Sequence, residues 1–169
     1  LPDGPASSPF DDEGVPTGRT PLIERGTLRA FLHNTQTAVR DGASSTGNAS
    51  RPGYRGVPGV APTNLLLEPG GETAEALLGR AGTAVYVQDV TGVHSGANPV
   101  SGEFSVGATG LRVDGGALAA PLREMTIAST LPDVLKAIEA VASDVRFFPG
   151  GGAIGTGTVL VGEMTVAGA

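Results

Sequence analysis

The chain has 169 residues, with no cysteine, no tryptophan, a single lysine (Lys136) and an aromatic fraction of only 4%. Without cysteine it can form no disulfide and can offer no thiolate to a metal or a substrate, which agrees with a reducing compartment. No apolar run approaches the roughly 20 residues that span a bilayer. We therefore expect neither a disulfide scaffold nor a membrane partner.

Charge is also scarce, since only 17% of the residues are charged and the formal net charge is −6. Proteins that bind nucleic acid neutralise phosphates with a clustered basic face. Here the ten arginines are scattered singly along the chain. The composition therefore argues against a nucleic-acid partner.

What the chain does contain is glycine and proline, 27 and 13 residues, beside an ordinary hydrophobic content of 40%. The length suits one domain with a real core. Two long irregular stretches are expected, residues 1–21 and 40–63, and loops of that length inside a domain are usually functional or disordered. Because the chain begins at Leu1 and not at methionine, we expect it to be a piece of a longer protein.

Alternating apolar residues and turn signals predict strands joined by hairpins. The expected strands are 22–24, 27–32, 64–68, 84–90, 104–113, 117–128 and 158–166. Two helices are expected, one over 73–80 that ends at Gly82 and one that starts at the N-cap Thr130 and continues through an apolar stripe to Val145. The order predicts an α+β fold with a large antiparallel or mixed, barrel-like sheet, long hairpins and two helices.

The most informative segment is 92–110, where a turn-rich loop continues into an alternating stretch that still carries Gly107 and Gly110. Glycine weakens a strand and usually marks a bulge or the close approach of another backbone or a ligand. The segment is therefore either a tight packing joint or one wall of a binding groove.

Several residue patterns resemble cofactor-binding or metal-binding motifs but lack the sequence context that these motifs require. Gly150 to Gly155 match the dinucleotide pattern G-x-G-x-x-G, but the motif needs a strand before it and a helix after it, and the expected order is the reverse. His33 and His94, the only histidines, stand 61 residues apart without the ligand spacing of a zinc site. His33 is expected to be a surface or turn residue.

Carboxylates and serines give no catalytic set either. The run Asp11-Asp12-Glu13 is expected to be a solvated turn in which an aspartate caps backbone N–H groups. Ser105 lacks the glycine two positions earlier that a nucleophile elbow requires. The sequence by itself therefore predicts no catalytic residues and no metal ligands in this chain.

Seven segments, taken in order, resemble the C-terminal part of the PmbA/TldD family of peptidase-related proteins, and more closely its PmbA (TldE) side. They are 8–14 (SPFDDEG), 22–26 (LIERG), 45–49 (STGNA), 62–65 (PTNL), 67–70 (LEPG), 98–108 (NPVSGEFSVGA) and 163–168 (EMTVAG). The resemblance implies that residues 1–169 are a single C-terminal domain, with 1–21 as an irregular N-terminal segment and an upstream domain outside this chain.

The resemblance also implies a function. The family is a cytoplasmic two-subunit protease whose TldD-type subunit holds zinc with a His-Glu-x-x-x-His helix and a cysteine from a glycine-rich loop before the last strand. In this chain that loop is 150–157, and it has no cysteine; the histidine motif is absent as well. We therefore expect a non-catalytic PmbA/TldE-like subunit, with zinc in a TldD-like partner, in a heterodimer or homodimer that processes peptides.

In this hypothesis the 92–110 segment lines the substrate cavity, because glycine permits close approach of an extended peptide. The residues expected to line it are His94, Asn98, Ser101, Phe104, Ser105 and Gly107. The main alternative is a structural or dimerisation domain that does not contact substrate. A third possibility is an autonomous hydrolase that uses His94 with a nearby carboxylate.

Overall fold

The structure is a computed structural model that describes residue 1, residues 4–149 and residues 152–168. The chain divides into two compact units. The first unit comprises Leu1–Leu67 with Arg146–Thr156, and the second comprises Glu68–Val145 with Gly157–Ala169.

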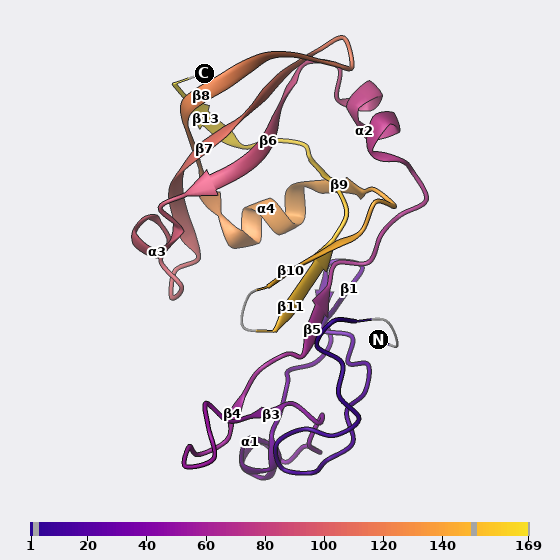
Figure 1. The fold of residues 1–169 in the computed structure, drawn as a ribbon, viewed down its shortest axis with the longest axis vertical. Helices are drawn as coiled ribbons and strands as arrows, with labels where there is room; N and C mark the ends of the chain where they lie inside the picture. Colours follow the sequence, from indigo (N-terminus) through magenta and orange to yellow (C-terminus); the bar gives the residue numbers. More distant parts are fainter. Residues whose placement is uncertain (2–3, 150–151, 169) are drawn as a thin grey trace. The chain divides into compact units, whose positions relative to one another are not determined.

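The first unit is built from a short helix and several short strands (Figure 1). They are β1 (Ile23–Glu24), β2 (Thr27–Leu28), α1 (Thr35–Asp41), β3 (Ala49–Ser50), β4 (Gly59–Val60), β5 (Asn64–Leu66), β10 (Arg146–Pro149) and β11 (Ala153–Thr156). Three small sheets result, since β1 pairs with β2, β3 pairs with β4, and β11 pairs antiparallel with β10 and parallel with β5.

Helix α1 begins where Asn34 caps it. The Asn34 Oδ1 atom accepts from the Thr37 N–H at 2.8 Å, and the Thr37 hydroxyl is 3.1 Å from the Asn34 N–H, which completes a reciprocal capping box. Gly42 ends the helix in the left-handed conformation. This helix was not expected from the sequence, because its seven residues carry no apolar stripe and only Ala38 is buried.

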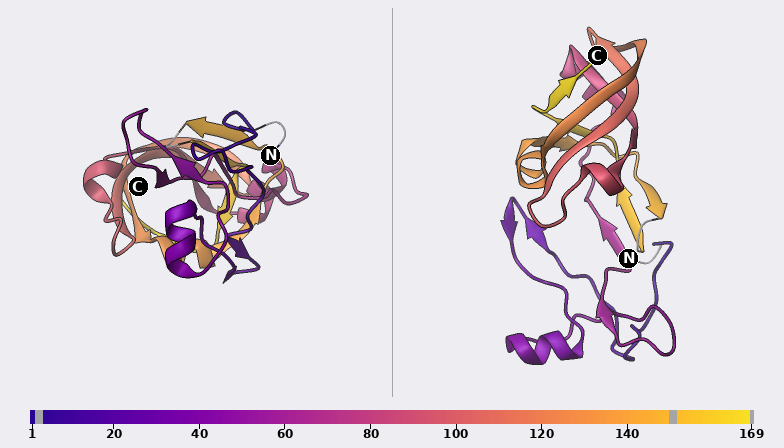
Figure 2. Two further views of the ribbon diagram at one scale, coloured as in Figure 1. Left: turned by 90° about the horizontal axis from the view of Figure 1, so that it is seen from below. Right: turned by 90° about the vertical axis from the view of Figure 1, so that its left-hand side faces the viewer.

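The second unit contains the longest strands. Its elements are α2 (Ala74–Ala81), β6 (Ala84–Thr91), α3 (Val93–Gly96), β7 (Glu103–Asp114), β8 (Ala117–Thr130), α4 (Leu131–Ala137), β9 (Ile138–Val141), β12 (Val159–Val161) and β13 (Thr165–Ala167). An antiparallel sheet has the strand order β13-β8-β7-β6, and β9 pairs with β12. Figure 2 shows the strong twist of the β7–β8 hairpin, whose paired residues Val106, Ala108, Met125 and Ile127 form a buried cluster.

The predicted α+β class is confirmed, and so is the hairpin about Asp114-Gly115-Gly116. The described residues form five separate sheets and not one large sheet, and none of them closes into a barrel. They also contain four helices and not two. None of these helices is long and apolar enough to cross a membrane.

The predicted helix over 130–145 is correct in its first half and wrong in its second half. Thr130 does cap it, because its side chain accepts from the Asp133 N–H, but the helix ends at Ala137. From Ile138 the backbone is extended and pairs with β12, which buries Val141. The apolar positions fit a helical period, but β-branched residues at these positions and a partner strand favour the extended form.

Other boundaries differ from the expectation as well. The predicted strand 27–32 is strand only over β2, and the stretch 40–63, expected to be irregular, contains β3 and β4. Part of the predicted glycine-rich loop 150–157 is strand β11, while Gly150 and Gly151 lie outside the described residues. The predicted strand 158–166 is two strands, β12 and β13, that belong to different sheets. Between them, the Gly162 N–H donates to the Ala137 carbonyl at 2.8 Å, so the chain changes partner there.

Candidate functional site

The 92–110 segment begins with the one-turn helix α3. Gly92 enters it with a positive φ of 78°, which glycine adopts without strain. The Gly96 N–H donates to the Gly92 carbonyl at 2.7 Å, and the Ala97 N–H donates to the Val93 carbonyl at 3.1 Å. His94 lies on this turn and is exposed.

A five-residue turn, 98–102, connects α3 to β7, and Asn98 organises it. The Asn98 Oδ1 atom accepts from the N–H groups of Val100 at 2.9 Å and Ser101 at 3.3 Å. The Gly102 N–H donates to the Asn98 carbonyl at 2.8 Å, and the Gly102 carbonyl accepts from the Leu131 N–H at 2.8 Å. The turn is therefore fixed by its own side chain and tied to the start of α4.

Ser101 is exposed at the end of this turn, with its hydroxyl 3.2 Å from Glu103 Oε2. A serine nucleophile needs an oriented base and donors for the oxyanion. The contacts of Ser101 provide only a carboxylate and the Glu103 N–H at 3.3 Å. This geometry does not supply the groups that a serine nucleophile requires.

Strand β7 places the remaining predicted residues on two faces. Successive side chains of a strand point to opposite sides of the sheet. Phe104 is half-buried and packs against the cluster that contains Val106 and Ala108. Ser105 is exposed and Gly107 half-buried on the opposite face. The structure therefore brings Ser105 and Gly107 together on one face and places Phe104 behind them.

The glycines of β7 are places of close backbone approach. A Cβ at Gly110 would collide with the Tyr86 carbonyl oxygen on β6, next to a bulge between Val87 and Asp89. A Cβ at Gly107 would lie 2.7 Å from the Thr91 hydroxyl. Gly110 is thus a packing joint between two strands, whereas the contact at Gly107 is with a side chain that can rotate.

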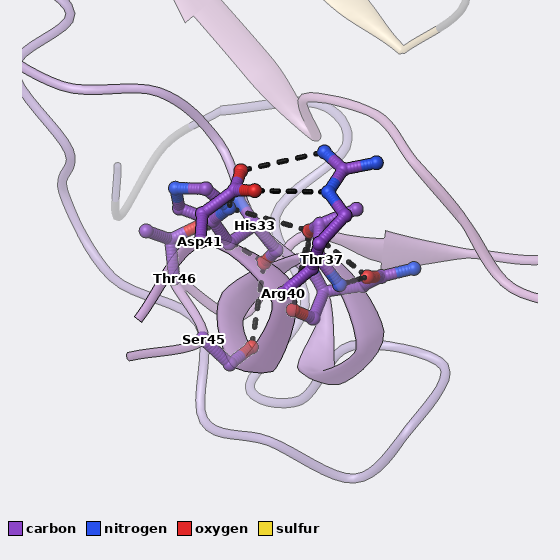
Figure 3. Close-up of polar contacts among 7 residues, drawn as sticks. His33, Thr37, Arg40, Asp41, Ser45 and Thr46 are labelled. Atoms are coloured by element: carbon purple, nitrogen blue, oxygen red, sulfur yellow. Dashed lines mark hydrogen bonds and ion pairs between the residues drawn. The ribbon is translucent and has the colours of Figure 1, made fainter. Parts of the chain in front are cut away.

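A second polar cluster surrounds His33 in the first unit (Figure 3). Its Nδ1 atom is 3.3 Å from the Thr37 hydroxyl and 4.0 Å from Asp41 Oδ2, and its side chain is 12% exposed. His33 is therefore more enclosed than the expected surface residue. The hydrogen bond from Arg40 Nε, at 2.9 Å, outweighs burial and holds the pKa of Asp41 below its ordinary value.

The acidic run Asp11-Asp12-Glu13 is a capped turn, as predicted. Asp11 Oδ1 accepts from the N–H groups of Glu13 and Val15, and Oδ2 accepts from the Ala49 N–H, each at 2.9 Å. Burial raises the pKa of Asp11, but these three backbone donors together lower it by more, so the pKa lies below its ordinary value. These carboxylates stabilise loops and do not form an acid–base pair.

The first unit also has an open hollow of about 400 Å³. Asn64 stands in its wall, accepting from the Ala6 N–H at 3.1 Å and donating to the Ser7 hydroxyl at 2.9 Å. Both polar ends of this side chain thus hold the neighbouring loop. Within the described ranges 1, 4–149 and 152–168, no three His, Asp or Glu side chains are grouped as metal ligands would be.

The family model of the PmbA/TldA metallopeptidase C-terminal domain matches residues 1–168. The chain therefore belongs to the PmbA/TldD family. It is 39% identical over 166 residues to the metalloprotease PmbA homolog of Haemophilus influenzae, covering 96% of this chain and 33% of that protein. It is 34% identical over 165 residues to the metalloprotease PmbA of Escherichia coli O157:H7, covering 98% of this chain and 33% of that protein.

Solved structures agree with this assignment. TldE from Thermococcus kodakarensis superposes with a TM-score of 0.88 at 27% identity, over 99% of this chain and 38% of that one. A protein of Thermotoga maritima described as a candidate modulator of a DNA gyrase also gives a TM-score of 0.88, at 40% identity over 99% of this chain and 37% of that one. The chain thus spans about a third of the length of its relatives.

Proposed function

We propose that this chain is the C-terminal domain of a PmbA/TldE-like subunit in a zinc metallopeptidase that processes peptides in the cytoplasm. The observation that carries the proposal is the match of residues 1–168 to the family's C-terminal domain, together with 34–39% identity to proteins named metalloprotease PmbA. Neither nucleic acid nor a membrane is part of the proposed function.

The zinc ligands would come from a TldD-like partner. The family resemblance places a cysteine ligand in the loop before the last strand, and this sequence has no cysteine. Its two histidines, His33 and His94, belong to different units. In the proposed heterodimer or homodimer, the role of this chain is to complete the assembly and its substrate cavity.

The 92–110 segment would form part of the cavity wall. His94, Asn98, Ser101 and Ser105 are exposed on it, and Gly107 lies beside Ser105 on the outward face of β7. A surface of small side chains allows an extended peptide backbone to come close. Phe104 would contribute from the inner face, by holding the wall in position.

The alternative is a structural or dimerisation domain that does not contact substrate. The specific observation in its favour is Gly110, where the absence of a side chain serves the contact between β6 and β7. The two proposals differ in what happens to peptide cleavage when the outward face of β7 is blocked.

Metal analysis tests the assignment of the zinc. The full-length protein is purified alone and together with a co-expressed TldD-like subunit, and zinc and peptidase activity are measured in both preparations. We expect stoichiometric zinc and activity only in the joint preparation. Stoichiometric zinc in the protein purified alone would refute the non-catalytic role.

A further inference from the structure

Glu103, the first residue of β7, carries the only formal charge of the 92–110 segment when His94 is neutral. Because side chains alternate along a strand, Glu103 shares its face with Ser105 and Gly107, which is the outward face in the proposed cavity wall. Its side chain is exposed at the end of that face. Within the proposed wall, Glu103 is therefore the residue that can supply a charge-assisted hydrogen bond.

The backbone of Glu103 is fixed by Asn98 and by β8. The Asn98 N–H donates to the Glu103 carbonyl at 2.8 Å. The Asn98 Oδ1 atom holds the turn between these two residues by accepting from the Ser101 N–H at 3.3 Å. On the other side, Glu103 pairs with Thr130 in the β7–β8 ladder. These contacts determine where the Glu103 side chain leaves the backbone.

The carboxylate itself is oriented by Ser101. The Ser101 hydroxyl donates to Glu103 Oε2 at 3.2 Å and accepts from the Glu103 N–H at 3.3 Å. One hydroxyl thus bridges the side chain and the backbone of Glu103. A carboxylate has about four lone-pair positions, so this contact leaves others that can accept from a ligand. A side chain that is held in place before it binds loses less conformational entropy on binding.

The charges of the second unit indicate the ligand chemistry. In the described part of this unit, the arginines that form ion pairs are Arg80 and Arg112, and their partners do not include Glu103. The unit has four basic and eleven acidic residues, a formal net charge of −7. A protein field of one sign attracts ligands of the opposite sign and raises their local concentration. The carboxylate and its surroundings therefore both favour a positively charged group.

We propose that Glu103 is a specificity-determining residue of the wall and binds a cationic N–H donor of the peptide, either a basic side chain or a free N-terminal amine. Asn98 and Ser101 are then positioning residues, since they act on the peptide through Glu103. This inference rests on the proposed peptidase subunit and adds the class of peptide that the wall selects.

The test compares kcat/KM on matched peptides, with the full-length protein in complex with its TldD-like partner. The peptides differ in one residue, which is lysine, norleucine or glutamate, and each is made with a free and an acetylated N-terminus. The wild-type complex should prefer the cationic peptides about tenfold over the neutral ones, as one charge-assisted contact would give. The preference should shrink as salt is added. Its loss on acetylation identifies the terminal amine as the bound group, and its persistence identifies the basic side chain.

Variants assign this preference to its residues. Glu103→Gln should reduce it to within twofold at an unchanged melting temperature, because the amide keeps an oxygen for Ser101 but carries no charge. Asn98→Ala should reduce it to about threefold, and Asn98→Ser, whose hydroxyl can accept within the same turn, should restore part of it. A merely structural role of Asn98 would lower the cleavage of every peptide equally. Glu75→Gln is the matched control, because Glu75 is an exposed carboxylate on α2 of the same unit, and it should leave the preference unchanged.

Different results overturn different parts of the inference. If the wild-type complex cleaves cationic and neutral peptides equally well, or if Glu103→Gln keeps the preference, the role of Glu103 is wrong while the proposed function survives. If Asn98→Ala keeps the full preference, the positioning role of Asn98 is wrong. If the wild-type complex cleaves no peptide, the proposed function itself fails.

Discussion

Removing the Asp11 carboxylate should loosen the polar core of the first unit. Asp11 accepts three backbone N–H bonds that join two segments, two of them from Glu13 and Val15 in its own turn and one from Ala49 at the start of β3. A hydrogen bond to a charged acceptor contributes about 1.5–3 kcal/mol when buried. Because Asp11 is only half-buried, we take about 1 kcal/mol for each bond. Asp11→Ala should thus cost about 3 kcal/mol.

Two further variants show how much of this loss depends on the Asp11 carboxylate itself. Asp11→Asn keeps one oxygen for the Glu13 and Val15 donors but turns an amide towards Ala49, so it should cost about 1 kcal/mol. Asp12→Ala removes the single hydrogen bond that the Arg51 N–H donates to an exposed carboxylate, and it should cost about 0.5 kcal/mol.

Amide hydrogen exchange reports these losses directly. In Asp11→Ala the amides of Glu13, Val15 and Ala49 should all exchange faster, and in Asp11→Asn chiefly that of Ala49. The stabilisation should also depend on pH. Since the pKa of Asp11 is lower in the folded state than the unfolded value of about 3.9, its contribution is present above that pH and is lost as the pH falls through the folded pKa. Equal exchange in Asp11→Ala and Asp12→Ala would refute this reasoning.

Two more predictions concern packing. Gly110→Ala should lower the free energy of unfolding of the second unit by about 3 kcal/mol, because the new methyl group would meet the Tyr86 backbone and not a movable side chain. Gly107→Ala, which faces the Thr91 hydroxyl, should cost clearly less, and chemical denaturation would measure both variants. Asn34→Ala should lower the free energy of unfolding by about 2–3 kcal/mol, since it removes the cap of α1 and the hydrogen bond that Asn34 Nδ2 donates to the Pro58 carbonyl. A melting temperature unchanged from the wild type would contradict this prediction.

Local signals in the sequence were sufficient for the β7–β8 hairpin. A glycine turn between two alternating runs specifies the register within the segment itself. Residues 138–145 could not be assigned in this way, because the apolar positions of this stretch also fit a helix. What decides their conformation is the pairing of Val141 with Val159, a contact between distant parts of the chain.

The candidate site was also only partly predictable. The sequence predicted a cavity wall at 92–110, which stays a prediction, but it did not predict that the Asn98 side chain would be used within its own turn. The loop 51–58 between β3 and β4 was expected only as irregular chain. Its path follows from how Asn34 and Asp12 hold the loop, which spacing alone does not reveal.

The two faces of β7 allow the cavity wall to be tested against a purely structural role. Phe104 packs on the inner cluster, so Phe104→Ala should lower the free energy of unfolding by about 2 kcal/mol, less than for a fully buried ring. Ser105 is exposed on the outer face, so Ser105→Tyr should fold normally and occupy space above Gly107.

Peptide cleavage by the assembled complex should show the reverse order, with the larger effect at Ser105 and the smaller one at Phe104. Ser105→Tyr should lower kcat/KM at least tenfold at unchanged melting temperature, because a ring on this face would obstruct an extended peptide. Phe104→Ala should lower kcat/KM clearly less than Ser105→Tyr does in the folded protein, since it alters the support of the wall and not its surface. Lys136→Ala, on α4, serves as the surface control for both measurements. If the complex with Ser105→Tyr cleaves peptides as fast as the wild-type complex, the outward face of β7 does not line the cavity. That result would favour the structural alternative, in which the glycines of β7 serve strand packing, as Gly110 does against β6.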